Sequence, residues 1–285
     1  MKLGLSLSGG GIKAATHIGA LKAFEESKIT FDVITGASSG SIVATLYSIG
    51  YTSDEILEIF KKFSKKIKYV SLSNIFKLMS EILFFRKIRT KGFNNGHVIE
   101  KTIKEICKKK NIKNISDIKM PLGITSVDMY ENKTIAFISS NILNNKSKDI
   151  HYINDVYIST AIKASSAYPG IFDPVYFKNY CLVDGGLKEN TPWKLAKDLG
   201  ANKVVNIIFN TPYKKCKCDN IFQVVESSIN ILSKEAALCD LEGAECLIEI
   251  PIKEGVNLLE SKFIDELYSL GYETTWKKIK EIKNL

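Results

Sequence analysis

A serine between two glycines, Ser38 in Gly36-x-Ser38-x-Gly40, has the residue types and the spacing of an exposed nucleophile. The run 32–35 predicts a short buried strand, and residues 39–50 predict a helix. A serine at such a strand-to-helix turn projects its hydroxyl into a cleft, and the glycines let neighbouring backbone pass closely. The helix start also favours negative charge beside it. Ser38 is therefore the candidate nucleophile, and Gly36 and Gly40 form its elbow.

Three consecutive glycines, Gly9, Gly10 and Gly11, lie between the first predicted strand and the first predicted helix. Such a loop exposes backbone N–H groups with no side chains in the way, as an oxyanion hole requires. Losing one oxyanion donor typically costs about 3–4 kcal/mol of transition-state stabilisation. Lys13, just beyond, is a candidate for holding an anionic head group; the alternative is a solvated surface lysine.

A serine nucleophile needs a base, and Asp184 ends an apolar run and precedes Gly185-Gly186. A carboxylate at a buried strand end can accept the serine proton directly. Because its ordinary pKa is near 3.9, burial or another influence must raise it. The alternative is a turn-forming Asp-Gly pair.

A Ser-His-Asp triad is less favoured, because no histidine follows the acid in the chain order of α/β-hydrolases. His17 is expected to pack or cap locally in the first helix, and the other two histidines are His97 and His151.

The glycine loop also fits a loose dinucleotide-binding pattern, Gly9-x-Gly11-x-x-Ala14. That pattern expects an acid at the end of the second strand. The nearby acid, Asp32, stands at the start of that strand, so this interpretation is disfavoured.

Predicted strands alternate with predicted helices along the chain, and several strands are continuously apolar. This pattern predicts one α/β domain over 1–285, with three α/β/α layers and a mainly parallel sheet. The stretch 53–95 is expected to form a helical cap or lid-like insertion. The predicted strands are 2–7, 32–35, 121–139 (two strands), 174–183, 204–209 and 246–250, and the predicted helices are 13–27, 39–50, 53–90 with a break near 69–74, 96–109, 153–166, 191–199, 221–241 and 261–282.

The 285 residues are 45% hydrophobic and 25% charged, which excludes a collagenous, disordered or coiled-coil protein.

The formal net charge is +9, and residues 61–91 hold ten Lys or Arg and one acid among many apolar side chains. This segment suits contact with an anionic membrane surface. A helix packed on the core with a solvated lysine face is the alternative. No recognisable nucleic-acid module accompanies the charge, and no pattern specifies an oligomeric state.

No apolar run approaches the roughly 18–20 residues that span a bilayer, and the N-terminus does not read as a secretory signal. We expect a cytoplasmic protein that is peripheral at a membrane.

The six cysteines do not form a disulfide scaffold. Cys216-x-Cys218 lacks a well-spaced second half-site, so no metal is expected.

Four blocks of the chain, in order, resemble the patatin-like phospholipase family. They are Gly9–Lys13 with His17–Leu21, then Gly36–Gly40, then Ala164–Pro169 with Phe172–Val175, and Val183–Gly186 with Asn190–Pro192. Together they span about two thirds of the chain.

The resemblance implies a serine–aspartate dyad lipid acyl hydrolase of bacterial type, with no cofactor. It makes Ser38 the nucleophile, Asp184 the base and Gly9, Gly10 and Gly11 the oxyanion-hole loop. Phospholipid or another acyl-ester lipid is the implied substrate, near which Lys13 and Pro169 are expected. Lys13 replaces the commoner arginine, and Ala14 replaces a usual glycine. An acyltransferase and a non-catalytic lipid-binding module of the same fold are the alternatives.

Overall fold

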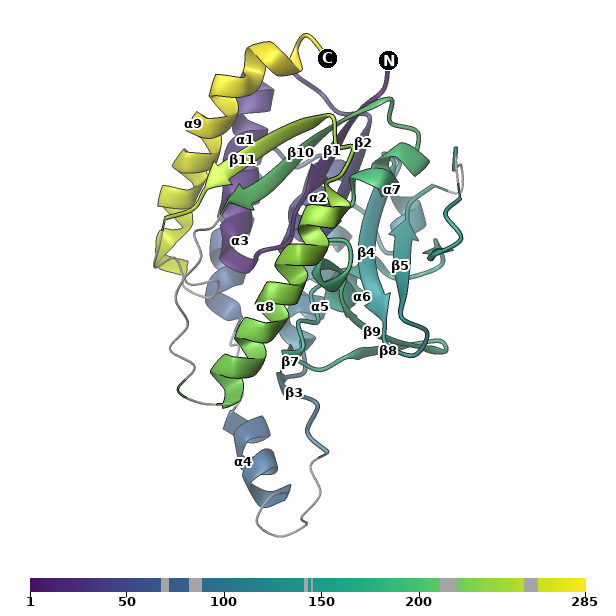
Figure 1. The fold of residues 1–285 in the computed structure, drawn as a ribbon, viewed down its shortest axis with the longest axis vertical. Coiled ribbons are helices and arrows are strands. Elements are labelled where there is room, and N and C mark those ends of the chain that lie inside the picture. Colours follow the sequence, from purple (N-terminus) through teal and green to yellow (C-terminus); the bar gives the residue numbers. More distant parts are fainter. Residues whose placement is uncertain are drawn as a thin grey trace.

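The computed structural model describes residues 1–67, 72–81, 89–140, 143–144, 146–210, 219, 221–253 and 261–285 (Figure 1). Its strands are β1 (Leu3–Leu7), β2 (Val33–Ala37), β3 (Gly92–Asn94), β4 (Leu122–Asp128), β5 (Lys133–Ile138), β6 (Ile150–Ile153), β7 (Gly170–Phe172), β8 (Val175–Phe177), β9 (Tyr180–Asp184), β10 (Lys203–Asn210) and β11 (Cys246–Pro251). Its helices are α1 (Ala15–Glu26), α2 (Ser39–Ser48), α3 (Ser53–Lys66), α4 (Leu72–Ser80), α5 (His97–Lys108), α6 (Ile158–Ser165), α7 (Trp193–Asp198), α8 (Ile221–Asp240) and α9 (Ile264–Ile282).

One mixed sheet forms the centre of the described part of the chain. Its main order is β11-β10-β1-β2-β4-β5-β6, and β9 pairs with β4 and with β8. The strands from β11 to β4 run parallel to one another, whereas β5 and β9 run antiparallel to β4. Strands β2 and β4 are buried along their whole length, as expected for strands covered on both faces. The predicted α/β class with a mainly parallel sheet is confirmed.

Helices cover both faces of the sheet. The larger core packs side chains from α1, α2, α3, α5, α6 and α9 against one face. A smaller core lies under α7 on the other face, where Trp193 and Leu195 meet Val33 and Ala136. Figure 1 shows α1 and α9 side by side on one flank. Helices α7 and α8 are joined where the indole N–H of Trp193 donates to the backbone oxygen of Asp240.

Helices from the two ends of the chain cross at glycines. A β-carbon on Gly19 of α1 would overlap the carbonyl oxygen of Tyr268, and one on Gly271 of α9 would overlap that of Thr16. The two backbones therefore touch directly, because neither crossing point carries a side chain. This contact fixes α9 against α1, the helix that follows the glycine loop.

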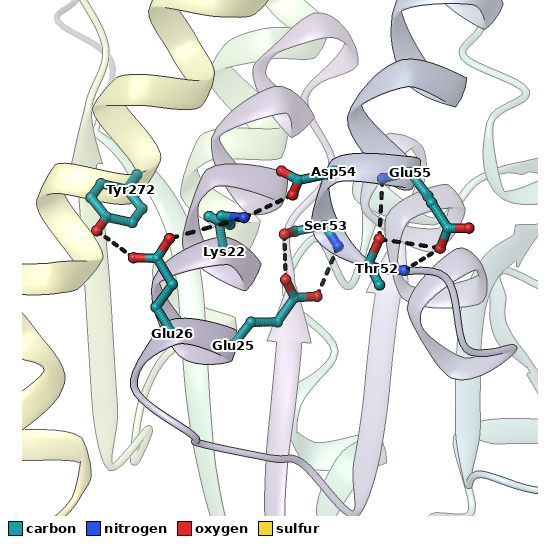
Figure 2. Close-up of polar contacts among 8 residues, drawn as sticks. All are labelled: Lys22, Glu25, Glu26, Thr52, Ser53, Asp54, Glu55 and Tyr272. Carbon is teal, nitrogen blue, oxygen red and sulfur yellow. Dashed lines mark hydrogen bonds and ion pairs between the residues drawn. The ribbon is translucent and has the colours of Figure 1, made fainter.

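Polar contacts join α1 to both α3 and α9 (Figure 2). Lys22 lies 2.8 Å from the Asp54 carboxylate of α3, and the Tyr272 hydroxyl of α9 donates to Glu26 at 2.7 Å. Thr52 and Glu55 cap the start of α3 reciprocally, as a Thr-x-x-Glu sequence predicts.

In the described part of the expected cap, 53–95, two helices have different surroundings. Helix α3 buries Ile56, Phe60 and Phe63 in the main core. Helix α4 projects from the body at the end opposite both termini (Figure 1), with Phe76 and Met79 exposed. The expected break near 69–74 lies partly outside the described residues, and α4 begins at Leu72.

The structure differs from the sequence predictions in two places. The helix predicted over 153–166 begins only at Ile158, because Ile150–Ile153 pair with β5 as β6. Strands β3 and β7, which pair with each other, were not predicted. Segments of three or four residues are too short to show a strand's alternating pattern.

Candidate active site

Two strands meet end to end along one edge of β4. Strand β2 runs parallel to β4 and ends with Ala37 opposite Thr125, whereas β9 runs antiparallel and ends with Asp184 opposite Ser126. Strand β5 occupies the other edge of β4 at the same positions. Because β2 and β9 approach from opposite directions, the residue that follows β2, Ser38, reaches the end of β9.

The backbone of Ser38 is held in a conformation that an ordinary residue avoids, with φ 48° and ψ −126°. The flanking glycines permit it. A β-carbon on Gly36 would lie 2.6 Å from the Gly40 carbonyl, and one on Gly40 would overlap the carbonyl oxygen of Leu7. The predicted tight turn between β2 and α2 is therefore present, and α2 begins at Ser39.

The Ser38 hydroxyl donates a hydrogen bond of 2.6 Å to Oδ2 of Asp184. Asp184 is 3% exposed, and Gly186 donates its N–H to the other carboxylate oxygen at 2.8 Å. Burial raises the pKa of Asp184 to about 6, although the hydrogen bonds from Ser38 and Gly186 oppose the rise. A carboxylate of that pKa is a better base than an exposed aspartate, so the pair can move a proton from Ser38 to Asp184.

Two further serines hold the backbone of Ser38. Ser165, the last residue of α6, accepts the Ser38 N–H at Oγ over 2.8 Å. The Ser41 hydroxyl donates to the Ser38 carbonyl at 2.6 Å. In the sequence, Ser165 stands out only as part of the block Ala164–Pro169 that resembles the family. Its position three residues before Tyr168-Pro169 does not predict a contact with Ser38.

The glycine loop lies directly against Ser38, since a β-carbon on Gly9 would sit 2.9 Å from Cβ of Ser38. Gly9 donates its N–H to Asn190, at 3.0 Å from Oδ1 and 3.2 Å from the backbone oxygen. Gly10 donates its N–H to Oγ of Ser39 at 3.1 Å. Gly11 has a φ of 60°, and no described residue accepts its N–H.

The three histidines do not complete a triad, because within the described chain none hydrogen-bonds to Ser38 or Asp184. His17 is fully buried beside the glycine loop and is bonded to the Ser8 carbonyl at 2.8 Å. His97 and His151 lie on α5 and β6.

The two expected substrate-binding residues, Lys13 and Pro169, are both half-buried. Burial lowers the pKa of Lys13 to about 8, and its ammonium lies 5.9 Å from the ring centre of Phe209. Pro169 is half-buried in the turn between α6 and β7. Neither residue has a contact with Ser38 among the hydrogen bonds of the described chain.

No cluster of three or more His, Cys, Asp or Glu side chains in the described residues could hold a metal ion. Three free cysteines there, Cys107, Cys181 and Cys246, are buried. The Cys216-x-Cys218 pair lies outside the described residues. No described helix is both long enough and apolar enough to cross a bilayer.

The fold and the site define an α/β protein with a serine at a strand-to-helix elbow, hydrogen-bonded to a buried carboxylate. The family model described as patatin-like phospholipase matches residues 5–197, and the chain belongs to that family. The match includes the glycine loop, the elbow and Asp184.

Relatives with similar sequences include lysophospholipase NTE1 of Lodderomyces elongisporus. It is 28% identical over 202 residues, which are 71% of this chain but 12% of that much longer protein. The uncharacterized protein R571 of Acanthamoeba polyphaga mimivirus is 30% identical over 211 residues, covering 72% of this chain and 64% of the relative.

Two solved structures share the fold at low sequence identity. VipD from Legionella pneumophila has a TM-score of 0.50 at 13% identity, covering 98% of this chain and 67% of that one. Human GIVD cytosolic phospholipase A2, in complex with methyl gamma-linolenyl fluorophosphonate, has a TM-score of 0.50 at 11% identity. The match covers 99% of this chain and 58% of that one.

Proposed function

We propose that this protein hydrolyses acyl esters of lipids through Ser38 as nucleophile and Asp184 as its base. The observation that carries the proposal is the 2.6 Å hydrogen bond from Ser38, at a strained elbow, to a buried carboxyl group of raised pKa. Membership of the patatin-like phospholipase family supports a serine lipid hydrolase.

In the first half of the reaction, Oγ of Ser38 attacks the ester carbonyl carbon while its proton moves to Oδ2 of Asp184. The tetrahedral oxyanion would bind the loop Gly9–Gly11. Gly11 offers an N–H without an acceptor in the described chain, and Gly10 donates to a neutral hydroxyl that a charged oxygen can replace. The ester C–O bond then breaks, and Asp184 returns the proton to the leaving oxygen.

In the second half, water gives a proton to Asp184 and attacks the acyl carbon. The bond from the acyl carbon to Ser38 breaks, Ser38 regains its proton from Asp184, and the fatty acid leaves. No step requires a metal ion or an organic cofactor.

The substrate class follows from the family and from relatives called lysophospholipases, which supports a phospholipase A-type, lysophospholipase or esterase activity. Acyl transfer to an alcohol would use the same acyl-enzyme, with the alcohol in place of water. A lipid-binding module without catalysis would have no need for the Ser38–Asp184 hydrogen bond.

The basic segment 61–91 is the proposed contact with an anionic membrane, where the protein would act as a cytoplasmic, peripheral enzyme. Three lysines near the end of α3, Lys62, Lys65 and Lys66, are exposed. On α4, Phe76 and Met79 are 70% and 51% exposed. Cations for lipid phosphates and apolar groups for the interface thus occur together. Movement of α4 as a lid belongs to the same proposal.

A fluorophosphonate probe followed by peptide mass spectrometry tests the nucleophile, because the probe labels activated serines. We expect labelling at Ser38 that disappears in Ser38→Ala and falls at least about 100-fold in Asp184→Asn. Asp149→Asn, which removes an exposed carboxylate, is the matched control. Circular dichroism should show that all three variants fold.

Hydrolysis of lysophospholipid and of a soluble short-chain ester then tests the reaction. Near-normal turnover by Asp184→Asn would contradict the dyad. Labelled Ser38 with acyl transfer to an added alcohol would identify an acyltransferase. No labelling with or without lipid vesicles would favour the binding module.

A further inference from the structure

One peptide unit of the glycine loop, between Ser8 and Gly9, is hydrogen-bonded at both of its polar groups. Its carbonyl oxygen, on Ser8, lies 2.8 Å from Nε2 of His17. Its N–H, on Gly9, is held by both oxygens of Asn190. The two partners come from separate parts of the chain, the first turn of α1 and the segment that follows Asp184.

The contact with Ser8 determines the protonation of His17. A carbonyl oxygen only accepts, so Nε2 must carry the hydrogen. The ring is fully buried and stacks on Phe209 with centres 4.8 Å apart, and its Nδ1 has no partner among the described residues. A hydrogen on Nδ1 would therefore be buried without an acceptor, which favours the neutral ring. His17 is thus a fixed donor and not a proton acceptor for Ser38.

Asn190 connects the glycine loop to the loop of the base. A β-carbon on Gly186 would lie 2.8 Å from Oδ1 of Asn190, so the two groups are in contact. Gly186 is also the residue whose N–H binds Asp184. On the other side, Gly9 touches the side chain of Ser38. The clamped peptide therefore lies between the nucleophile and the segment that carries its base.

We infer that His17 and Asn190 are positioning residues that clamp the Ser8–Gly9 peptide and thereby direct the following N–H groups toward the developing oxyanion. The inference rests on the proposed hydrolysis at Ser38. A rotated Ser8–Gly9 peptide would change the direction of the N–H groups of Gly10 and Gly11, which follow it in the chain. Oxyanion stabilisation depends on donors that are aimed before the reaction begins.

Two substitutions of His17 separate its hydrogen bond from its packing. In His17→Gln, the amide nitrogen stands the same number of bonds from Cβ as Nε2 and can donate to Ser8. In His17→Met, the chain has similar length and no donor. We expect His17→Met to lower kcat for a soluble ester and the labelling rate of Ser38 about 10- to 100-fold with KM little changed. We expect His17→Gln to restore most of the loss.

The pH profile distinguishes positioning from base catalysis. The acid limb should stay at the same pH in His17→Met as in the parent chain, because Asp184 is untouched. An acid limb that moves, equal losses in the Gln and Met variants, or an unchanged rate in His17→Met would each overturn the inference.

A measurement without substrate separates the clamp from the proposed function. Nitrogen NMR should show His17 neutral at pH 7 with the hydrogen on Nε2, and hydrogen exchange at the Gly9 amide should quicken in His17→Met. A charged ring at pH 7 or unchanged exchange would overturn the clamp, whatever the activity. If Ser38 is labelled but no lipid ester is hydrolysed, the proposed function fails while the labelling rates still decide the clamp.

Discussion

The Asp184 carboxylate and the Ser38 hydroxyl are 2.6 Å apart although 146 positions separate them in the chain. The contact exists because β2 and β9 share one edge of β4 and end beside each other. The same arrangement buries Asp184 and raises its pKa to about 6, which gives the proposed reaction a measurable dependence on pH.

The activity should rise with pH through about 6, since Asp184 must be unprotonated to accept the Ser38 proton. Below that pH, kcat/KM for a soluble ester should fall about tenfold per pH unit. Measurement between pH 4 and 9 checks this, with circular dichroism at each pH to confirm folding. An acid limb near 4, the ordinary range of an aspartate, would contradict the role given to burial.

Ser165→Ala should destabilise the protein and slow labelling of Ser38, because the Ser38 N–H loses its acceptor at the strained elbow. The expected cost is about 1–3 kcal/mol in the free energy of unfolding. Ser166 is the matched control, since its buried hydroxyl has no partner in the described chain. Urea denaturation should show Ser166→Ala unchanged or slightly more stable, and equal costs in the two variants would refute the prediction.

The sequence predicted where the proposed nucleophile, Ser38, and the proposed base, Asp184, stand, because each occupies a strand end marked by glycines. The placement of Ser38 at an elbow and of Asp184 at the end of β9 is confirmed. The sequence did not predict the register of β2 and β9 along β4, which brings these two strand ends together. Register depends on pairing between strands that are distant in the chain, and an apolar run predicts a strand without indicating which strand it pairs with.

The residues that hold the site were not predicted as a group. Three of these residues, Ser165, Asn190 and His17, occur in helical or polar segments. Side chains of these types there commonly cap a helix or pack locally, so their types alone do not predict contacts with the site. Their hydrogen bonds to Ser38 and Gly9 exist only once α1, α6 and the segment after β9 have packed on the sheet. Local sequence therefore indicates the proposed reacting groups, Ser38 and Asp184, better than it indicates the residues that hold them in place.

Gly271→Ala should destabilise the protein by about 3 kcal/mol, because the added methyl group meets the Thr16 carbonyl where α9 crosses α1. This outweighs the gain of about 1 kcal/mol that alanine brings to a helix interior. Gly50→Ala is the comparison, since Gly50 has open space but a φ of 82°. It should cost about 1 kcal/mol. Urea denaturation that ranks Gly50→Ala as the more harmful change would show that the helices do not touch at Gly271.

Glu189 should make the protein less stable as pH rises. Burial, followed by the nearby charge of Asp240, raises its pKa to about 7, and its Oε2 has no partner in the described chain. A carboxyl group whose folded pKa exceeds its unfolded value of 4.5 contributes stability that is complete at low pH and lost as pH rises through about 7.

Unfolding by urea at pH 5 and pH 8 measures this loss, which should be about 1–3 kcal/mol from Glu189. Glu189→Gln should reduce the difference between the two pH values, since an amide does not ionise. Glu131→Gln, at an exposed position, should leave the difference unchanged. If the free energy of unfolding falls equally between pH 5 and pH 8 in the parent chain and in Glu189→Gln, Glu189 is not the group responsible.

Replacing Lys62, Lys65 and Lys66 by glutamine should weaken binding to vesicles that contain anionic lipid. The three lysines are exposed on α3 within the basic segment 61–91, and a lysine near an anionic surface contributes about 1 kcal/mol. We therefore expect binding to fall by about 100-fold at low salt. Replacing Lys277, Lys280 and Lys283, exposed at the C-terminal end, removes the same charge from another part of the molecule. Vesicle sedimentation should show a much smaller loss of binding for this second variant. Equal losses in the two variants would mean that net charge, and not the basic segment 61–91, governs binding.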